Sequence, residues 1–242
     1  MILLHGLFGM GDNLGLLARA LSANFQVISL DLRNHGRSPW VPGMDMQAMA
    51  ADVIGFLDEQ GITRADFVGH SLGGKIAMQV ALDYPQRVRR LVVADIAPVT
   101  YAGNHDEVFA ALRAVDLDFV HSRSEVATVL SQHLAEQGVV QFLLKSLYRN
   151  EQGQYRWRMN VDVLEGCYDQ LRQGYQGDGQ FSGATLFIKG EQSAYIQAGH
   201  QSLIASLFPN YQFKMIQGTG HWLHAEKPKV FNRLVENFLQ AA

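Results

Sequence analysis

The sequence has little cysteine, little net charge and no long apolar run, and each of these absences excludes a class of protein. Its one cysteine, Cys167, has no partner in the chain for a disulfide, and no Cys and His residues stand at zinc-site spacing. We therefore expect a reducing compartment and no structural metal. The formal net charge of −3 gives no electrostatic reason to expect nucleic acid or an anionic membrane as a partner. No apolar stretch is long enough to span a membrane.

The first 23 residues are apolar and end Leu-Ser-Ala, which superficially resembles a secretion signal. They lack the positively charged start of a signal peptide, and Asp12 and glycine-rich turns interrupt the apolar stretch. We therefore interpret this segment as part of the folded chain and expect a cytoplasmic protein.

Short apolar runs alternate with helical patterns along the chain. Strands are expected at residues 1–4, 25–30, 65–68, 91–94, 184–188 and 211–216. Helices are expected at 14–21, 46–60, 75–82 and 229–240. This order predicts an α/β fold with a mostly parallel central sheet and helices on both faces.

Almost ninety residues separate the strands at 91–94 and 184–188, which is far too many for a crossover connection. The segment is mainly helical in pattern. We predict that residues 99–180 form a helical cap over the carboxyl ends of the strands, and that 1–98 and 181–242 form the core of one α/β domain. Its apolar runs at 108–112 and 142–144 fit ordinary core packing better than an acyl pocket, which stays open as the alternative.

Gly69-His70-Ser71-Leu72-Gly73 lies between an expected strand and an expected helix. Glycines two before and two after the serine allow a tight turn and a close approach of helix and strand. Ser71 is then held out at the edge of the sheet, at the start of a helix. This context predicts that Ser71 is a nucleophile, whereas the bare motif in a glycine-containing chain can also arise by chance.

A serine nucleophile needs a histidine to take its proton. His221 is the strongest of nine candidates, because Gly218-Thr219-Gly220-His221 follows the last expected strand and a glycine-rich turn returns it over the carboxyl edge of the sheet. His224 is close by but is expected to point elsewhere. A solvated surface histidine is the alternative interpretation of His221.

Two backbone N–H groups are needed to stabilise the oxyanion of a tetrahedral intermediate. One is expected from Leu72, which follows the nucleophile. The other is expected from the turn His5-Gly6-Leu7-Phe8-Gly9, with Leu7 the first candidate and Phe8 the second. Because no dinucleotide-binding or Walker pattern is present, we expect no nucleotide and no cofactor.

The acid that orients the histidine is missing from its usual place. In most proteins of this plan it follows the penultimate strand, where this chain has Ser193, with Glu191 two residues before it. Asp95, at the end of the strand after the nucleophile, lies near the expected position of His221. We favour Asp95 over Glu191; the alternative for Asp95 is a turn-capping role.

Taken together, these motifs resemble the α/β-hydrolase superfamily over essentially the whole chain. The segments 5–9, 31–39, 69–75, 95–99 and 220–222 further resemble the bacterial YbfF-type esterases. The resemblance implies hydrolysis of carboxylic esters and acyl-CoA thioesters, and a triad acid on the strand after the nucleophile, which matches Asp95. The segment Asp31-Leu32-Arg33-Asn34-His35-Gly36-Arg37-Ser38-Pro39 is expected to be structural, with Arg37 or Asp31 tying loops together, rather than substrate-binding.

Proteins of this fold usually begin with a strand hairpin, which is expected to be absent here because the first strand starts almost at Met1. Its absence would expose the apolar edge at residues 25–30, and we predict weaker stability or self-association.

The sequence therefore predicts a serine hydrolase with Ser71, His221 and Asp95, acting on small-molecule esters or thioesters without metal or cofactor. A carbon–carbon bond hydrolase or lyase on the same scaffold stays open, as does a binding protein that has lost the chemistry. The oligomeric state is not predicted.

Overall fold

The computed structural model describes residues 1–241, and a six-stranded sheet lies at its centre. The strands are β1 (Ile2–Leu4), β2 (Ile28–Leu30), β3 (Ala65–His70), β4 (Val88–Ala94), β7 (Ala184–Gly190) and β8 (Tyr211–Ile216). Their order is β2-β1-β3-β4-β7-β8, and every pairing is parallel. The predicted parallel sheet is confirmed.

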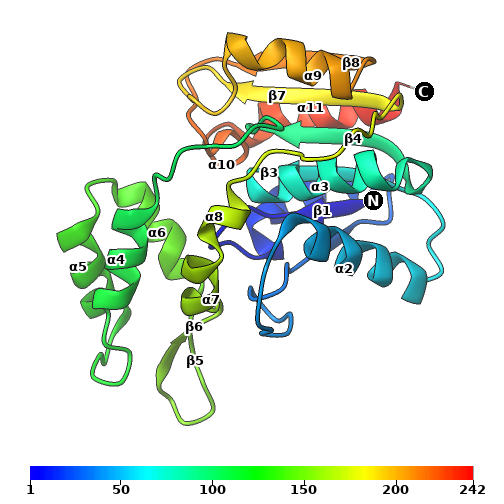
Figure 1. Ribbon diagram of the computed structural model, residues 1–242. Helices are drawn as coiled ribbons and strands as arrows, with labels where there is room; N and C mark the ends of the chain where they lie inside the picture. Colours follow the sequence, from blue (N-terminus) through cyan, green and yellow to red (C-terminus); the bar gives the residue numbers. More distant parts are fainter. Residues whose placement is uncertain (242) are drawn as a thin grey trace.

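Helices cover both faces of the sheet (Figure 1). One face packs against α2 (Met46–Glu59), α3 (Leu72–Asp83) and α9 (Gln201–Leu207), and the other against α1 (Gly15–Leu21) and α11 (Pro228–Gln240). Successive strand residues alternate between the two faces, as the β-strand repeat requires: Ile2 and Leu4 pack on the first, Leu3 on the second. Short helices lie at Gly11–Leu14, Pro85–Arg87, Ala198–His200 and, as α10, at Leu223–Glu226.

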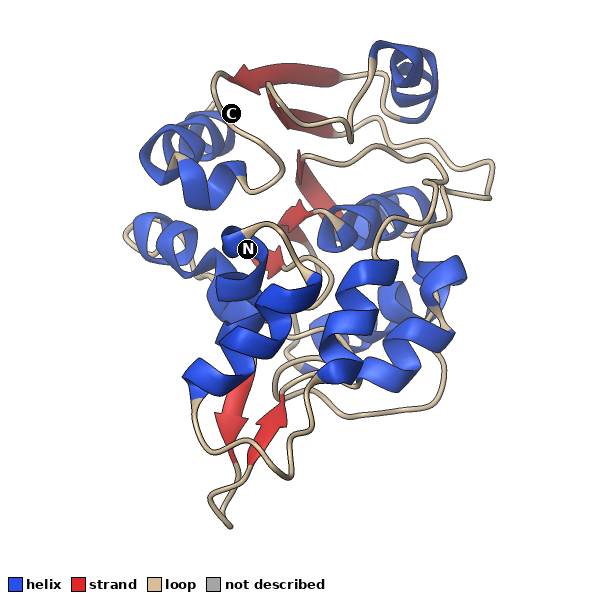
Figure 2. Ribbon diagram, turned by 90° about the vertical axis from the view of Figure 1, so that its left-hand side faces the viewer, coloured by secondary structure: helices blue, strands red, loops and turns tan. Residues whose placement is uncertain are grey.

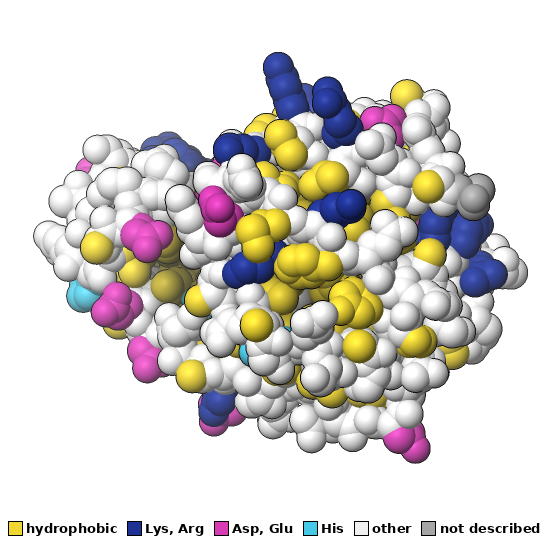
Figure 3. Space-filling view, turned by 90° about the horizontal axis from the view of Figure 1, so that it is seen from above, with side chains coloured by type: hydrophobic (Ala, Val, Ile, Leu, Met, Phe, Trp, Pro, Cys, Tyr) yellow, Lys and Arg dark blue, Asp and Glu magenta, His cyan; other side chains and the backbone are white. Residues whose placement is uncertain are grey.

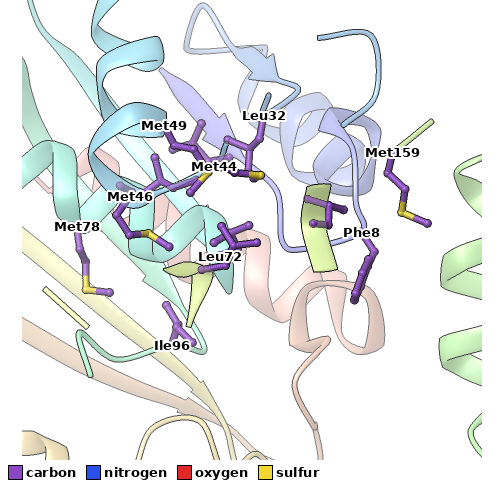
Figure 4. Packing of buried hydrophobic residues seen from close by; sticks show 14 of the residues in the cluster. Phe8, Leu32, Met44, Met46, Met49, Leu72, Met78, Ile96 and Met159 are labelled. Carbon is purple, nitrogen blue, oxygen red and sulfur yellow. The ribbon is translucent and has the colours of Figure 1, made fainter. Parts of the chain in front are cut away.

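The core between α2, α3 and the loops that follow β1 and β2 is rich in methionine (Figure 4). Unbranched methionine side chains fill irregular spaces well. The same cluster includes Leu72 and Phe8, which flank the serine turn and the His5-Gly6 turn, so packing continues beneath the expected site. The buried methionines are Met44, Met46, Met49, Met78 and Met159.

Between β4 and β7 the chain forms an inserted group of helices, defined here as the inserted segment (residues 99–180). It comprises α4 (Asp106–Ala114), α5 (Arg123–His133), α6 (Gln137–Lys145), α7 (Val161–Gly166), α8 (Tyr168–Leu171) and the hairpin β5 (Leu147–Arg149) with β6 (Tyr155–Trp157). The segment lies on the side toward which the strands β4 and β7 point (Figures 1 and 2). The hairpin is a correction to the all-helical expectation, since three-residue strands are too short to give a period-two pattern. The division into core and cap stays a prediction.

At one edge of the sheet, β2 is shorter than the predicted strand at 25–30. Phe25 and Val27 precede it and pack against the α1 and α11 side of the core instead. Ile28 and Leu30 are half-buried, and no strand within residues 1–241 pairs with the outer side of β2. Self-association through this edge stays a prediction.

None of the helices within residues 1–241 combines the length and apolar character that a bilayer crossing requires.

Candidate active site

Ser71 occupies the turn between β3 and α3 in a strained backbone conformation, with φ of 53° and ψ of −120°. Only four non-glycine residues among 1–241 have a positive φ, and three of them, Phe8, Ser71 and Asp95, lie together at the carboxyl end of the sheet. Strain of this kind persists where the surrounding structure holds it in place, and it marks functional sites more often than ordinary turns.

The glycines around Ser71 allow helix α3 to contact the sheet. A Cβ on Gly69 would lie 2.2 Å from the carbonyl oxygen of Gly73, and a Cβ on Gly73 would lie 2.2 Å from the carbonyl oxygen of Leu4. Both contacts are with backbone, which cannot swing away as a flexible side chain can. The turn therefore needs glycine at both positions.

We predict that Gly69→Ala destabilises the protein by about 3 kcal/mol, because the new methyl group forces helix and strand apart. Gly55→Ala is the matched control: Gly55 lies in the exposed part of α2 with no atom within 4 Å of its Cβ position. It should gain about 0.5–1 kcal/mol from helix propensity and chain entropy. Urea unfolding of both variants measures the difference, and equal stability of the two would contradict the prediction.

His221 links Ser71 to Asp95 from a loop that follows β8. Its Nε2 lies 2.9 Å from Ser71 Oγ, and its Nδ1 lies 2.7 Å from Oδ2 of Asp95. The loop crosses close to β7, since a Cβ on Gly190 would lie 2.0 Å from the carbonyl oxygen of Gly220. The structure thus brings together the three side chains that the sequence analysis favoured.

Asp95 is fully buried at the end of β4. One carboxylate oxygen accepts the backbone N–H of Gly190 at 2.9 Å, and the other accepts His221 Nδ1–H and the hydroxyl of Ser193. A buried carboxylate requires such partners to offset the loss of hydration. Ser193, which stands where an aspartate was expected, therefore supports the aspartate that lies on the neighbouring strand.

Glu191, the alternative acid, does not contact His221. It is exposed, and Oε2 accepts the backbone N–H of Gly218 at 2.7 Å. Glu226 makes a similar contact with the N–H of Gly220 at 2.9 Å. Both glutamates hold the loop that carries His221.

The turn after β1 lies against the serine. An ideal Cβ on Gly6 would lie 3.2 Å from Cβ of Ser71, which places Leu7 beside the nucleophile. The Phe8 N–H donates to Nε2 of His35 at 3.3 Å and is therefore occupied. Within residues 1–241 the N–H groups of Leu7 and Leu72 have no protein acceptor. Of the three predicted oxyanion donors, the Leu7 and Leu72 N–H groups are available and that of Phe8 is not.

Buried histidines surround this turn and the loop of His221. His5 accepts the N–H of Leu32 at 3.0 Å, and Nε2 of His70 donates to the carbonyl of His221 at 2.8 Å. His224 packs on His70, with ring centroids 4.3 Å apart, so it points away from Ser71 as predicted. Burial lowers the pKa of His5 and His224 to about 4 and that of His35 to about 3. Nothing in the motif pattern separated these packing histidines from His221.

These neutral histidines predict acid-sensitive stability. In the unfolded chain each binds a proton near pH 6.5, whereas in the native protein it does so only near pH 3 to 4, so the unfolded state binds more protons in between. The free energy of unfolding should therefore fall as the pH drops from 6.5 toward 4, by about 1.4 kcal/mol per pH unit for each histidine.

Urea unfolding at pH 7.5, 6 and 5 measures this slope. His35→Gln should make the slope shallower, and His133→Gln, at an exposed position, should leave it unchanged. A slope that does not differ between these two variants would contradict the assignment.

Tyr195 covers one face of the His221 ring. The two rings stack with centroids 4.0 Å apart and an interplanar angle of 24°. The carbonyl of Tyr195 accepts the hydroxyl of Tyr101 at 2.6 Å, which connects the start of the inserted segment to the site. Sequence reasoning missed this residue, because its role arises only where two distant loops meet.

A cavity of about 470 Å³ opens in front of Ser71, between the core and the inserted segment. From the two apolar runs of the inserted segment, Val108, Phe142 and Leu143 line it, whereas Phe109 and Leu112 are buried in the core. The favoured packing interpretation is therefore correct for only part of these runs. No group of three or more His, Cys, Asp or Glu within residues 1–241 is arranged to hold a metal ion.

Asp31 ties neighbouring loops together, as one of the two predicted residues. Its carboxylate accepts the backbone N–H of Gly11 at 2.6 Å and that of Arg37 at 2.8 Å. Gly36 has a φ of 58°, and a Cβ there would lie 2.2 Å from the same carboxylate.

Comparison with known proteins agrees with this geometry. Residues 1–228 match the protein family described as alpha/beta hydrolase fold. The chain is 42% identical to "Esterase YbfF" of Escherichia coli over 98% of its length and 92% of that protein. It is 39% identical to "sn-1-specific diacylglycerol lipase ABHD11" of Mus musculus, over 98% of its length and 80% of the lipase. A solved structure, "Marine microorganism esterase", superposes with a TM-score of 0.95 at 39% identity, covering 98% of this chain and 94% of that one.

Proposed function

Since the chain belongs to the alpha/beta hydrolase fold family and is an enzyme with esterase relatives, we propose that it is a serine carboxylesterase with a Ser71–His221–Asp95 triad. The observation that carries the proposal is the continuous hydrogen-bond path from Ser71 Oγ through both nitrogens of His221 to a buried carboxylate. Such a path activates a hydroxyl that is otherwise a weak nucleophile at neutral pH.

In the first half of the reaction, Ser71 Oγ attacks the carbonyl carbon of the ester while His221 Nε2 takes its proton. Asp95 accepts Nδ1–H, keeps Nε2 unprotonated in the resting state and stabilises the imidazolium that forms. The negative oxygen of the tetrahedral intermediate accepts the N–H groups of Leu7 and Leu72. Collapse of the intermediate expels the leaving group, which takes the proton from His221, and leaves an acyl group on Ser71.

In the second half, His221 removes a proton from water, and the resulting nucleophile attacks the acyl carbon. The same N–H groups stabilise the second tetrahedral intermediate, and Ser71 leaves with the proton that His221 returns. Every proton and bond change in this cycle is handled by residues of the chain. Acyl thioesters undergo the same acyl transfer, and we include them in the proposal.

Labelling and hydrolysis together test the proposal. A fluorophosphonate probe should modify Ser71, identified by peptide mass spectrometry, and p-nitrophenyl butyrate should be hydrolysed with a burst of p-nitrophenol equal to the enzyme concentration if deacylation is slow. A protein that is labelled but inert toward esters would favour carbon–carbon bond hydrolysis. A folded protein that is neither labelled nor active would favour a binding role.

A further inference from the structure

The charged side chains that line the cavity in front of Ser71 all have one sign. They are Glu107 on α4, Glu136 before α6 and Glu226 on α10, and no Lys or Arg of residues 1–241 lines the cavity. Glu107 and Glu136 are exposed on the side of the inserted segment, and Glu226 faces them from the core, next to the loop of His221. The three carboxylates therefore border the same opening from both sides.

The remaining lining residues add no compensating positive charge. Burial lowers the pKa of His105 to about 4 and that of His70 well below its ordinary value, so both are uncharged at neutral pH. Lys145, at the end of α6, is close enough to lower the pKa of His224, but it is exposed and does not line the cavity.

The surroundings of the cavity have the same sign. Residues 106–145, which contain α4 to α6, carry six carboxylates and three cationic side chains. Two of the three cations are engaged, since Arg113 pairs with Glu165 and Arg123 donates to the carbonyls of Leu144 and Leu147. In Figure 3, Asp and Glu side chains gather on the side formed by the inserted helices, and most visible Lys and Arg side chains lie elsewhere.

The rest of the wall is apolar, with Leu7, Val108, Val139, Phe142, Tyr195 and Trp222 facing the space. We propose that this cavity selects esters and thioesters whose leaving group is uncharged and discriminates against polyanionic leaving groups such as coenzyme A. This selectivity rests on the proposed acyl-transfer function and narrows its thioester part to uncharged thiols.

The physical reason is electrostatic. A cleft lined by one sign of charge repels ligands of that sign and lowers their encounter rate, by tenfold or more where the charges are poorly screened. The acyl chain occupies the apolar wall in either case, while the phosphates of coenzyme A would have to lie at the opening, near Glu107 and Glu136. Ions in solution screen such repulsion over about 10 Å at 0.1 M salt and over about 30 Å at 0.01 M.

The experiment compares butyryl-coenzyme A with butyryl-pantetheine, which has the same acyl group and thiol arm but no phosphates. At about 0.01 M ionic strength, kcat/KM should be about tenfold higher for the pantetheine thioester, and added salt should close the gap by raising the rate on the coenzyme A thioester. If neither thioester is cleaved, p-nitrophenyl butyrate and its 3-carboxy derivative give the same comparison, with a smaller gap.

A pair of double variants separates the cavity from net charge. Glu107→Gln with Glu136→Gln should bring the pantetheine-to-coenzyme A ratio toward one. Glu59→Gln with Glu151→Gln changes the net charge equally at exposed sites away from the cavity and should leave the ratio unchanged. Glu226 is kept, because it holds the N–H of Gly220 beside His221.

Equal or faster cleavage of the coenzyme A thioester at low salt, or a ratio that neither salt nor the first variant moves, would overturn the selectivity while leaving the esterase function intact. Failure to cleave any ester or thioester would instead overturn the proposed function.

Discussion

Ser71→Ala should lower kcat for ester hydrolysis by about 10⁶-fold, since it removes the only group that forms the acyl-enzyme. The remaining N–H groups and cavity would still bind the substrate and stabilise an oxyanion, so a small rate above that of water should survive. Stopped and continuous assays with p-nitrophenyl butyrate measure the loss, and the fluorophosphonate probe should no longer label the protein.

The loss must not come from misfolding. Alanine meets the same positive φ as serine at position 71, so the variant keeps the backbone strain and should unfold at nearly the wild-type temperature. Ser202→Ala, on the exposed surface of α9, controls for the substitution itself and should be fully active. A Ser71→Ala protein that keeps more than a hundredth of the activity would indicate a different nucleophile.

Asp95→Asn should lower kcat by about 10⁴-fold. An asparagine amide keeps the size of the side chain but can present an N–H to Nδ1 of His221, which lies 2.7 Å from the carboxylate. The imidazole then carries its proton on Nε2, where it can no longer accept from Ser71, and the imidazolium loses its counter-charge. Steady-state kinetics on p-nitrophenyl butyrate measure the effect.

Two neighbouring substitutions show whether the effect belongs to Asp95. Ser193→Ala removes one of three donors to Asp95 and should cost more than Glu191→Gln, which only weakens a contact to the Gly218 N–H, and both should cost far less than Asp95→Asn. If Glu191→Gln were as damaging as Asp95→Asn in a stably folded protein, the assignment of the acid would be wrong.

The parts of this molecule that the sequence predicts well are those whose signal is local. The serine turn needs glycines at 69 and 73 because of contacts within a few residues, and the pattern of those residues announces it. The parallel sheet follows from short apolar runs that alternate with helices, and its order was confirmed. The hairpin at Leu147–Trp157 escaped, since its two strands are too short to show a period.

The remaining features depend on contacts between distant segments. Asp95 and Glu191 both follow strands that end near His221, and only the register of β4 against β7 puts Asp95 under the imidazole. The contribution of Ser193 could not be read from its position, because a serine there has meaning only once Asp95 lies opposite. The second oxyanion candidate failed for a similar reason, since the partner of the Phe8 N–H, His35, lies 27 residues away.

The three proposed catalytic side chains are anchored unequally. The N–H of Ser71 donates to Ala94 at 3.0 Å and that of Asp95 to Ile188 at 2.8 Å, so both extend strands in the middle of the sheet. His221 stands instead on a loop held by surface glutamates and by one bond from Gln192 to Thr219. Local opening of such a loop requires less free energy than melting the sheet. On heating, the enzyme should therefore lose activity at a temperature where its circular dichroism is still that of the folded protein, and recover it on cooling.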